Sequence, residues 1–135
     1  MKQILLFALL AGLFGCEKAE ENIQQNIILE AMTSGYWKVS SYKMGGMDHT
    51  TDFTSYKFQF KTNYTVDALR NASVEKTGSW EADPAARTIT STFSNAADPL
   101  PLLNGTWTIT RNSWTYVEAK QTISGTEHSL RLDKE

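Results

Sequence analysis

The fold of this chain is constrained most by a two-residue alternation of apolar and polar side chains that begins at Tyr36. Successive side chains of a β-strand point to opposite faces, so this period predicts strands with one buried face. About eight short segments follow the pattern, with turn residues between them: 37–40, 56–61, 64–68, 78–82, 87–93, 106–110, 114–116 and 130–132. Such a series is typical of a β-sandwich or β-barrel, and its short connections favour an up-and-down antiparallel order.

The composition agrees with a single small β domain. The chain has 135 residues, and its 6 Phe, 4 Trp and 5 Tyr, with frequent threonine, favour strands over helices. The formal net charge is −2, and removal of residues 1–15 would take away one charge, that of Lys2, leaving about −3. We therefore expect no nucleic-acid binding, which requires an excess of cationic side chains against phosphates.

The first sixteen residues have the pattern of a bacterial export signal. Lys2 precedes an apolar run at 4–14, which at 11 residues is shorter than the roughly 20 needed to cross a membrane. The segment 13–16, Leu-Phe-Gly-Cys, resembles the bacterial lipobox, although Phe14 stands where a small residue is usual. The resemblance implies cleavage before Cys16, a thioether-linked diacylglycerol on Cys16 and N-acylation, for example by palmitate. The alternative is a buried free cysteine behind an ordinary signal peptide.

A lipidated Cys16 would anchor the protein to a membrane of the cell envelope. We expect the outer membrane, on its periplasmic or cell-surface face. Because Cys16 is the only cysteine, the fold contains no disulfide. The predicted organisation is a signal peptide at 1–15, a lipidated cysteine with tether and short helix at 16–30, and a barrel domain at 31–135. The apolar spacing places the helix at 22–33.

Three strand starts share a Gly-x-Trp pattern, at 35–37, 78–80 and 105–107. Core packing explains Gly35, Trp37, Trp80 and Trp107 by itself. The first repeat, behind a short helix, also resembles the lipocalins, and the wider pattern resembles the small lipocalin-like lipoproteins of Bacteroidetes. The resemblance implies an eight-stranded up-and-down antiparallel barrel, with Arg131 stacked over Trp37 as a cation–π contact. The chain is shorter than a typical lipocalin and lacks its cysteine pair.

An eight-stranded barrel has room for its own side chains or for one small ligand. By alternation the interior receives these residues: Trp37, Val39, Tyr56, Phe58, Phe60, Tyr64, Val66, Trp80, Ile89, Phe93, Trp107, Ile109, Leu130 and Leu132, with Trp114 and Tyr116 from the seventh strand. This aromatic bulk favours a mostly filled interior over an apolar cavity.

We expect a small apolar ligand to bind at the barrel mouth. The aromatic residues predicted to bind it are Tyr36, Tyr42, Tyr56 and Trp114, with the 44–54 loop as a lid. The alternative is a non-catalytic interaction or scaffold lipoprotein, in which the loops of a filled barrel contact a protein partner. Apart from such a ligand or partner, we expect a monomer.

The sequence offers little sign of catalytic chemistry. Asp48, His49 and Asp52 share one loop, but preferred zinc sites add cysteine or several histidines, so no metal is expected. His128 stands alone near the C-terminus and is expected to be a rim or packed residue. Without a nucleophile elbow or a phosphate-binding loop, the chain is predicted to have no catalytic residue and no cofactor, and not to be an enzyme.

Overall fold

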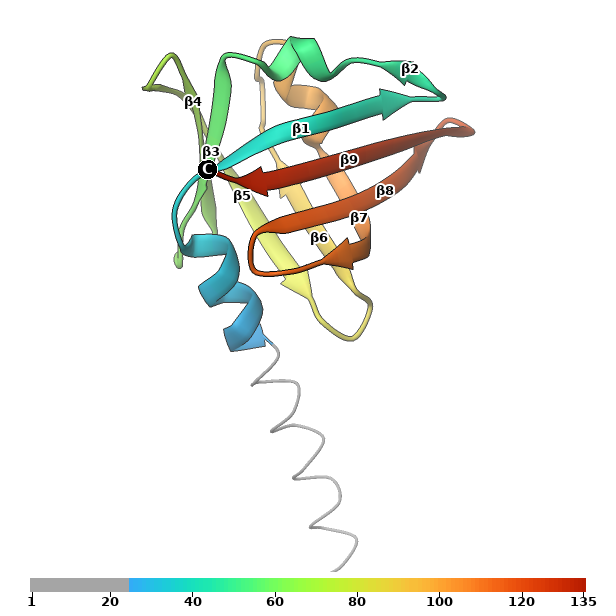
Figure 1. Ribbon diagram of the computed structural model, residues 1–135. Helices are drawn as coiled ribbons and strands as arrows, with labels where there is room; N and C mark the ends of the chain where they lie inside the picture. The colour runs from blue at the N-terminus through green and yellow to red at the C-terminus, as the bar shows by residue number, and fades with distance from the viewer. Residues whose placement is uncertain (1–24) are drawn as a thin grey trace, which may run out of the picture.

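The computed structural model describes residues 25–135, which form a closed antiparallel β-barrel with a short helix at its N-terminal side (Figure 1). The helix spans residues 25–33. The strands are β1 (Trp37–Met44), β2 (Met47–Asp48), β3 (Tyr56–Phe60), β4 (Thr65–Arg70), β5 (Ser73–Asp83), β6 (Thr88–Thr92), β7 (Gly105–Asn112), β8 (Tyr116–Ile123) and β9 (Thr126–Lys134). Two 3₁₀ helices interrupt the longer connections, η1 (Thr50–Phe53) and η2 (Leu100–Leu103).

Eight of the strands follow one another around the barrel in chain order. Each pairs antiparallel with the next, and β1 closes the barrel by pairing with β9 from Trp37↔Lys134 to Met44↔His128. The two-residue strand β2 is an addition beside the end of β1. The predicted fold, an all-β eight-stranded up-and-down barrel with a short N-terminal helix, is therefore confirmed. The predicted signal peptide and Cys16 lie outside the described residues.

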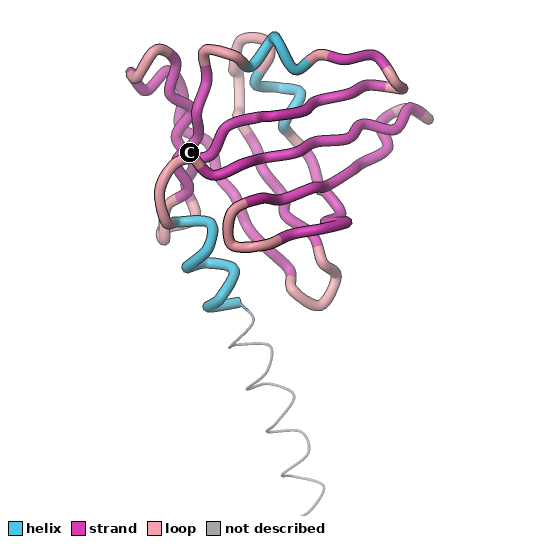
Figure 2. The backbone as a smooth tube through the Cα atoms, viewed as in Figure 1, coloured by secondary structure: helices cyan, strands magenta, loops and turns pink. Residues whose placement is uncertain are grey.

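The alternating strand directions give the barrel two different ends (Figure 2). We call one the helix end; it carries the helix and the turns at 61–64, 84–87 and 113–115. The other is the loop end; it carries the connections 45–55 and 93–104 and the turns at 71–72 and 124–125. The first described residue, Gln25, therefore belongs to the end opposite η1 and η2.

The barrel wall opens at one seam, between β1 and β3. These strands pair only at Trp37↔Phe58, near the helix end, while the far part of β1 pairs with β2 instead. The segment 45–55 fills the divergence, and the side chain of Phe53 lies buried with its ring 5.4 Å from that of Tyr42. This segment was predicted to be a lid; the structure shows it packed into the loop end.

The predicted interior is correct for most strands. Of the predicted set Tyr64 and Trp114 are exposed; Tyr64 occupies the β3–β4 turn with a positive φ of 64° and lies outside the alternation. The assignment for β8 is wrong by one residue: Val117 and Ala119 are buried, whereas Tyr116 is only partly buried and Trp114 lies exposed in the preceding turn. A one-residue shift of phase exchanges the two faces of a strand, and the large aromatic residues suggested the wrong phase.

The three Gly-x-Trp tryptophans attach the closing segments to the barrel. All three are buried, and the backbone at Gly35 and Gly105 has positive φ values of 77° and 110°, which glycine adopts without strain. Each indole Nε1 donates a hydrogen bond to a backbone carbonyl: Trp37 to Met32 (2.9 Å), Trp80 to Lys61 (3.1 Å) and Trp107 to Leu103 (3.0 Å). The acceptors lie in the helix, the β3–β4 turn and η2, so the repeat joins each of these segments to the wall.

Candidate functional site

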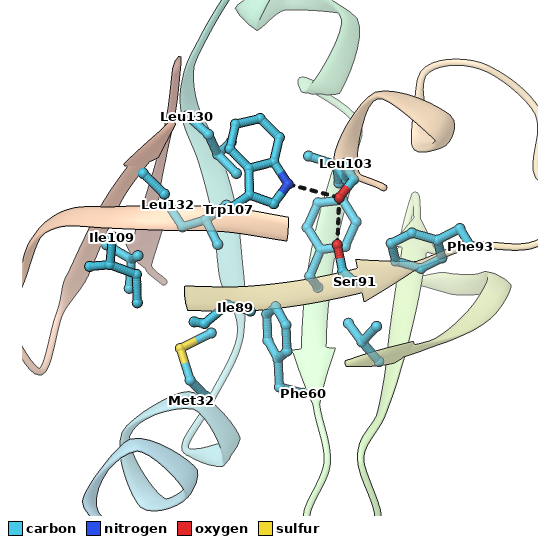
Figure 3. A pocket seen from close by; sticks show the side chains of 14 residues that line it. Met32, Phe60, Ile89, Ser91, Phe93, Leu103, Trp107, Ile109, Leu130 and Leu132 are labelled. Atoms are coloured by element: carbon cyan, nitrogen blue, oxygen red, sulfur yellow. Dashed lines mark hydrogen bonds between the residues drawn. The ribbon is translucent and has the colours of Figure 1, made fainter. Parts of the chain in front are cut away.

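The barrel interior is almost filled. Its cavity measures about 50 Å³ and is lined by fourteen residues, of which Met32, Phe60, Trp107 and Leu132 are examples (Figure 3). The one polar side chain in this lining is Ser91, whose Oγ donates to the Leu103 carbonyl at 2.5 Å. The cavity therefore offers an apolar surface without a free polar side chain to orient a ligand. An apolar cavity of about 150 Å³ holds benzene, so this one is too small for a ring or an acyl chain.

The helix closes one end of this cavity. Met32 is buried and lines it, while Ile28 and Leu29 are partly buried against the core. Besides the bond from Trp37, the Lys134 Nζ donates to the Ala31 carbonyl at 3.0 Å. A cation at the C-terminus of a helix is favourable, because the last carbonyls lack partners within the helix. Ile27, on another side of the same helix, is 46% exposed.

The cation over Trp37 is a correction to the prediction from the lipocalin resemblance. Lys134 Nζ lies 5.1 Å from the centre of the Trp37 ring. The guanidinium of Arg131 instead lies 4.5 Å from the Tyr116 ring and contacts the carboxylates of Glu118 (2.7 Å) and Asp133 (2.9 Å). Arg131 lies on β9 between Leu130 and Leu132, whose side chains point into the barrel, so the Arg131 side chain points outward. It therefore lies on the face of the wall opposite to the buried Trp37 ring.

A larger hollow lies outside the cavity, at the loop end beside the β1–β3 seam. This hollow, the mouth groove, measures about 520 Å³. It is lined by Met44, His49, Asp52, Ser55, Tyr56, Arg70, Asp98, Pro99 and Leu102. Four of these nine side chains are acidic or basic groups, which distinguishes the groove from the apolar interior. Its walls come from the two long connections and from the ends of β1, β3 and β4. The groove lies where β1 and β3 have parted, since these two strands pair only at Trp37 and Phe58.

The polar groups of the groove are partly held in place. Tyr56 donates through its hydroxyl to Glu75 Oε2 at 2.5 Å, and Arg70 Nη1 lies 3.5 Å from the other oxygen of Glu75. Burial raises the pKa of Tyr56, and its hydrogen bond to the Glu75 carboxylate raises the pKa further. His49 Nδ1 lies 3.4 Å from Asp52 Oδ2 across the groove wall. The arrangement presents both signs of charge over an aromatic and aliphatic floor.

Beneath the groove lies a buried polar contact. The Tyr42 hydroxyl donates to the Leu102 carbonyl at 2.8 Å and lies 2.9 Å from His128 Nδ1. Since a hydroxyl has a single proton, His128 must donate from Nδ1 if Tyr42 donates to Leu102. Burial raises the pKa of Tyr42 to about 12, so the phenol stays protonated near neutral pH. This contact connects β1, β9 and η2 under the groove floor.

The four residues predicted to bind a ligand do not meet at one site. Tyr36 and Trp114 belong to the helix end, whereas Tyr42 and Tyr56 belong to the loop half of the barrel. Tyr42 is fully buried, and Lys57 Nζ covers the Tyr36 ring at 4.6 Å. Only Tyr56 lines the mouth groove.

The groove residues that the sequence analysis missed are Ser55, Arg70, Asp98, Pro99 and Leu102. All but Ser55 come from two segments distant in the chain from the 44–54 loop, and no periodic pattern marks them. The sequence does mark 94–103 as one of the longer loops, because it contains Asn, Asp and two Pro residues. Long loops often carry functional residues, and this is the one sequence signal for this side of the groove. Asp48 lies outside the groove lining. Its carboxylate accepts from the Thr50 hydroxyl at 2.5 Å and from the Thr50 backbone N–H at 2.8 Å, and these two bonds, the hydroxyl first, hold the pKa of Asp48 below its usual value.

Two further observations concern the described residues as a set. Among residues 25–135, no three His, Cys, Asp or Glu side chains are grouped as they would be around a metal ion. Over the same residues, no helix has the length and apolar character needed to cross a bilayer.

The comparisons with known proteins concern the fold. No family model and no curated protein matches the chain. A crystal structure of a DUF4847 family protein from Bacteroides vulgatus matches with a TM-score of 0.57 and 14% sequence identity, covering 80% of this chain and 97% of that chain. At this identity the likeness shows a shared barrel fold alone, and the lipocalin-like family is not confirmed.

Proposed function

We propose that this protein is a lipid-anchored, non-catalytic interaction module of the cell envelope, which contacts a protein partner through the mouth groove. The observation that carries the proposal is the contrast between the interior cavity and the mouth groove. The interior measures about 50 Å³ and is apolar, whereas the groove measures about 520 Å³ and carries four charged or titratable side chains besides Tyr56. Pockets for small apolar ligands are lined predominantly by apolar and aromatic groups, which favours a polar contact in the groove.

The position of the groove also supports this role. Cys16 precedes the helix, and the helix lies at the end opposite the groove. A lipid on Cys16 would therefore tether the protein by one end and leave the groove directed toward partners.

Lipidation is tested first, by metabolic labelling with an alkyne fatty acid followed by membrane fractionation. We expect wild-type protein to carry the label and to fractionate with membranes. The Cys16→Ser variant, which lacks the only thiol, is expected to lose both properties. A label that persists on Cys16→Ser, or wild-type protein without label, would contradict the anchor.

The groove is tested by a photo-crosslinking amino acid placed at position 98 in the host cell. A matched position is Glu81, an exposed acidic residue of β5 that lines a different surface hollow, of about 630 Å³. We expect a discrete protein adduct from position 98, none from position 81, and loss of the adduct when Arg70→Glu reverses a groove charge. Arg70 is exposed, so loss of its 3.5 Å ion pair with Glu75 should cost about 1 kcal/mol and leave the variant folded at the assay temperature, which its melting temperature checks. Equal adducts from positions 98 and 81, or none from 98, would exclude the groove as the contact.

A second candidate function is binding of a small apolar ligand in the interior, which the cavity wall favours because Ser91 is its one polar side chain and is already hydrogen-bonded. Entry would require Met32 to move, since the present cavity is too small. Native mass spectrometry of protein purified from its host decides this: a retained apolar molecule supports the second candidate, and a bare polypeptide mass excludes it.

A further inference from the structure

The exposed apolar side chains differ in kind between the two ends of the barrel. Six large ones are exposed among residues 25–135: Ile27, Tyr64 and Trp114 at the helix end, and Met47, Val74 and Ile123 at the loop end. Both aromatic residues of this set lie at the helix end. Trp114 is 54% exposed, while the other three tryptophans are at most 3% exposed.

Trp114 is presented by a well-defined turn. It lies between β7 and β8, where the Ser113 N–H donates to the Tyr116 carbonyl at 2.9 Å. The Lys134 N–H donates to the Thr115 carbonyl at 2.8 Å, so the turn is also bonded to the end of β9. Within the described residues, the aromatic and cation–π contacts do not include the Trp114 ring. Exposure of the ring is therefore a property of a fixed turn.

The length of chain before the helix limits how far this end can lie from an anchor. Eight residues, 17–24, lie between Cys16 and Gln25, so nine residue-to-residue steps connect them. Even fully extended, they span about 30 Å at most. A lipid on Cys16 thus keeps the helix end near the bilayer surface. Tryptophan and tyrosine prefer the headgroup region, because the ring is apolar and the N–H or O–H remains hydrogen-bonded.

We propose that the helix end is a membrane-docking surface, with Trp114 inserted at the lipid headgroups and with Tyr64 and Ile27 exposed at the same end of the barrel. The inference rests on the proposed lipid anchor. Its occupant is a phospholipid bilayer, since the tether brings no other surface so close. Docking would turn a flexible attachment into an oriented one and direct the mouth groove away from the membrane.

The test exploits the single cysteine and the single exposed tryptophan. The chain from Cys16 onward is coupled through its thiol to a maleimide phospholipid in vesicles, which fixes the anchor whether or not the cell lipidates it. Brominated phospholipids then quench only tryptophans that touch the bilayer. We expect wild-type emission to fall by up to about a quarter, the share of one tryptophan in four. The Trp114→Phe protein should show no quenching, because its three tryptophans are buried.

The matched control moves the tryptophan to the other end. Ile123 lies exposed beside the β8–β9 turn, at the loop end. In the Trp114→Phe background, Ile123→Trp should remain unquenched. Equal quenching of wild type and Trp114→Phe, or quenching of Ile123→Trp as strong as that of Trp114, would overturn the docking surface. Neither result bears on the lipid anchor itself, which the labelling of Cys16 tests separately.

Discussion

Replacement of Met32 by alanine tests whether the N-terminal helix closes the barrel. The side chain is buried, lines the interior cavity and comes from the helix, while its backbone carbonyl still accepts from Trp37 in the variant. The substitution removes three heavy atoms without removing that hydrogen bond. It therefore isolates the contribution of side-chain packing between helix and barrel.

The magnitude follows from the cavity. If each of the three removed groups leaves about the 30 Å³ that a water molecule occupies in the liquid, the void grows by roughly 90 Å³. At about 24 cal/mol per Å³ this growth costs roughly 2 kcal/mol. Loss of three buried groups at about 0.8 kcal/mol each adds a similar amount. We expect the free energy of unfolding to fall by about 4 kcal/mol, within the range seen for buried methionine.

The assay is urea unfolding of the chain from Cys16 onward, with a second readout in benzene binding. The enlarged cavity approaches the roughly 150 Å³ that holds benzene, so benzene should raise the melting temperature of Met32→Ala and leave wild type unchanged. Ile27→Ala, on the exposed side of the same helix, is the control and should cost under about 1 kcal/mol. A loss below about 1 kcal/mol for Met32→Ala would refute the docked helix.

Three further predictions follow from other contacts. Trp37→Phe leaves the Met32 carbonyl without its indole donor and should cost roughly 2–4 kcal/mol, with faster amide exchange in the helix; unchanged exchange would contradict this role. Lys61 holds the pKa of Asp67 below its usual value, so the stabilisation is complete above the unfolded pKa of about 3.9 and is lost as pH falls through the lower folded pKa. Asp67→Asn should therefore flatten the fall of stability in acid, measured as the urea midpoint against pH, and an unchanged slope would argue against the pair. Gly78→Ala places a Cβ against the backbone of β6 and should cost about 2–3 kcal/mol, which a melting temperature equal to wild type would disprove.

Much of the fold could be predicted from the sequence, because the alternation of apolar and polar residues within one strand already shows which side chains face the interior. Trp37, Phe58 and Trp107 were assigned to the interior by alternation alone, and they are buried. The errors arise where a local pattern is ambiguous. Tyr64 lies in a turn, where alternation does not apply. Near the start of β8 the aromatic residues Trp114 and Tyr116 suggested that the even-numbered positions face inward, whereas Val117 and Ala119 are the buried ones.

The candidate site was far less predictable. Among the residues expected to bind a ligand, Tyr56 alone lies in the mouth groove. The groove exists because β1 and β3 part after one residue pair and the segment 45–55 fills the gap. Such a divergence depends on pairing between distant strands and on the packing of Phe53, neither of which has a local signature.

The sequence by itself determined the all-β class and the up-and-down order of the strands, because side-chain alternation and turn residues act over a few neighbours. Whether the strands close into a barrel or form a sandwich was left open by this pattern, and the resemblance to lipocalins favoured the barrel. The single cysteine and the apolar run before it likewise set the predicted anchor. Only the tertiary structure decided how full the interior is, because cavity volume depends on side chains meeting from strands and helix together. It also decided which cation covers Trp37 and which end carries the groove, since strand register and closure bring Lys134 and Arg131 to opposite faces of one wall.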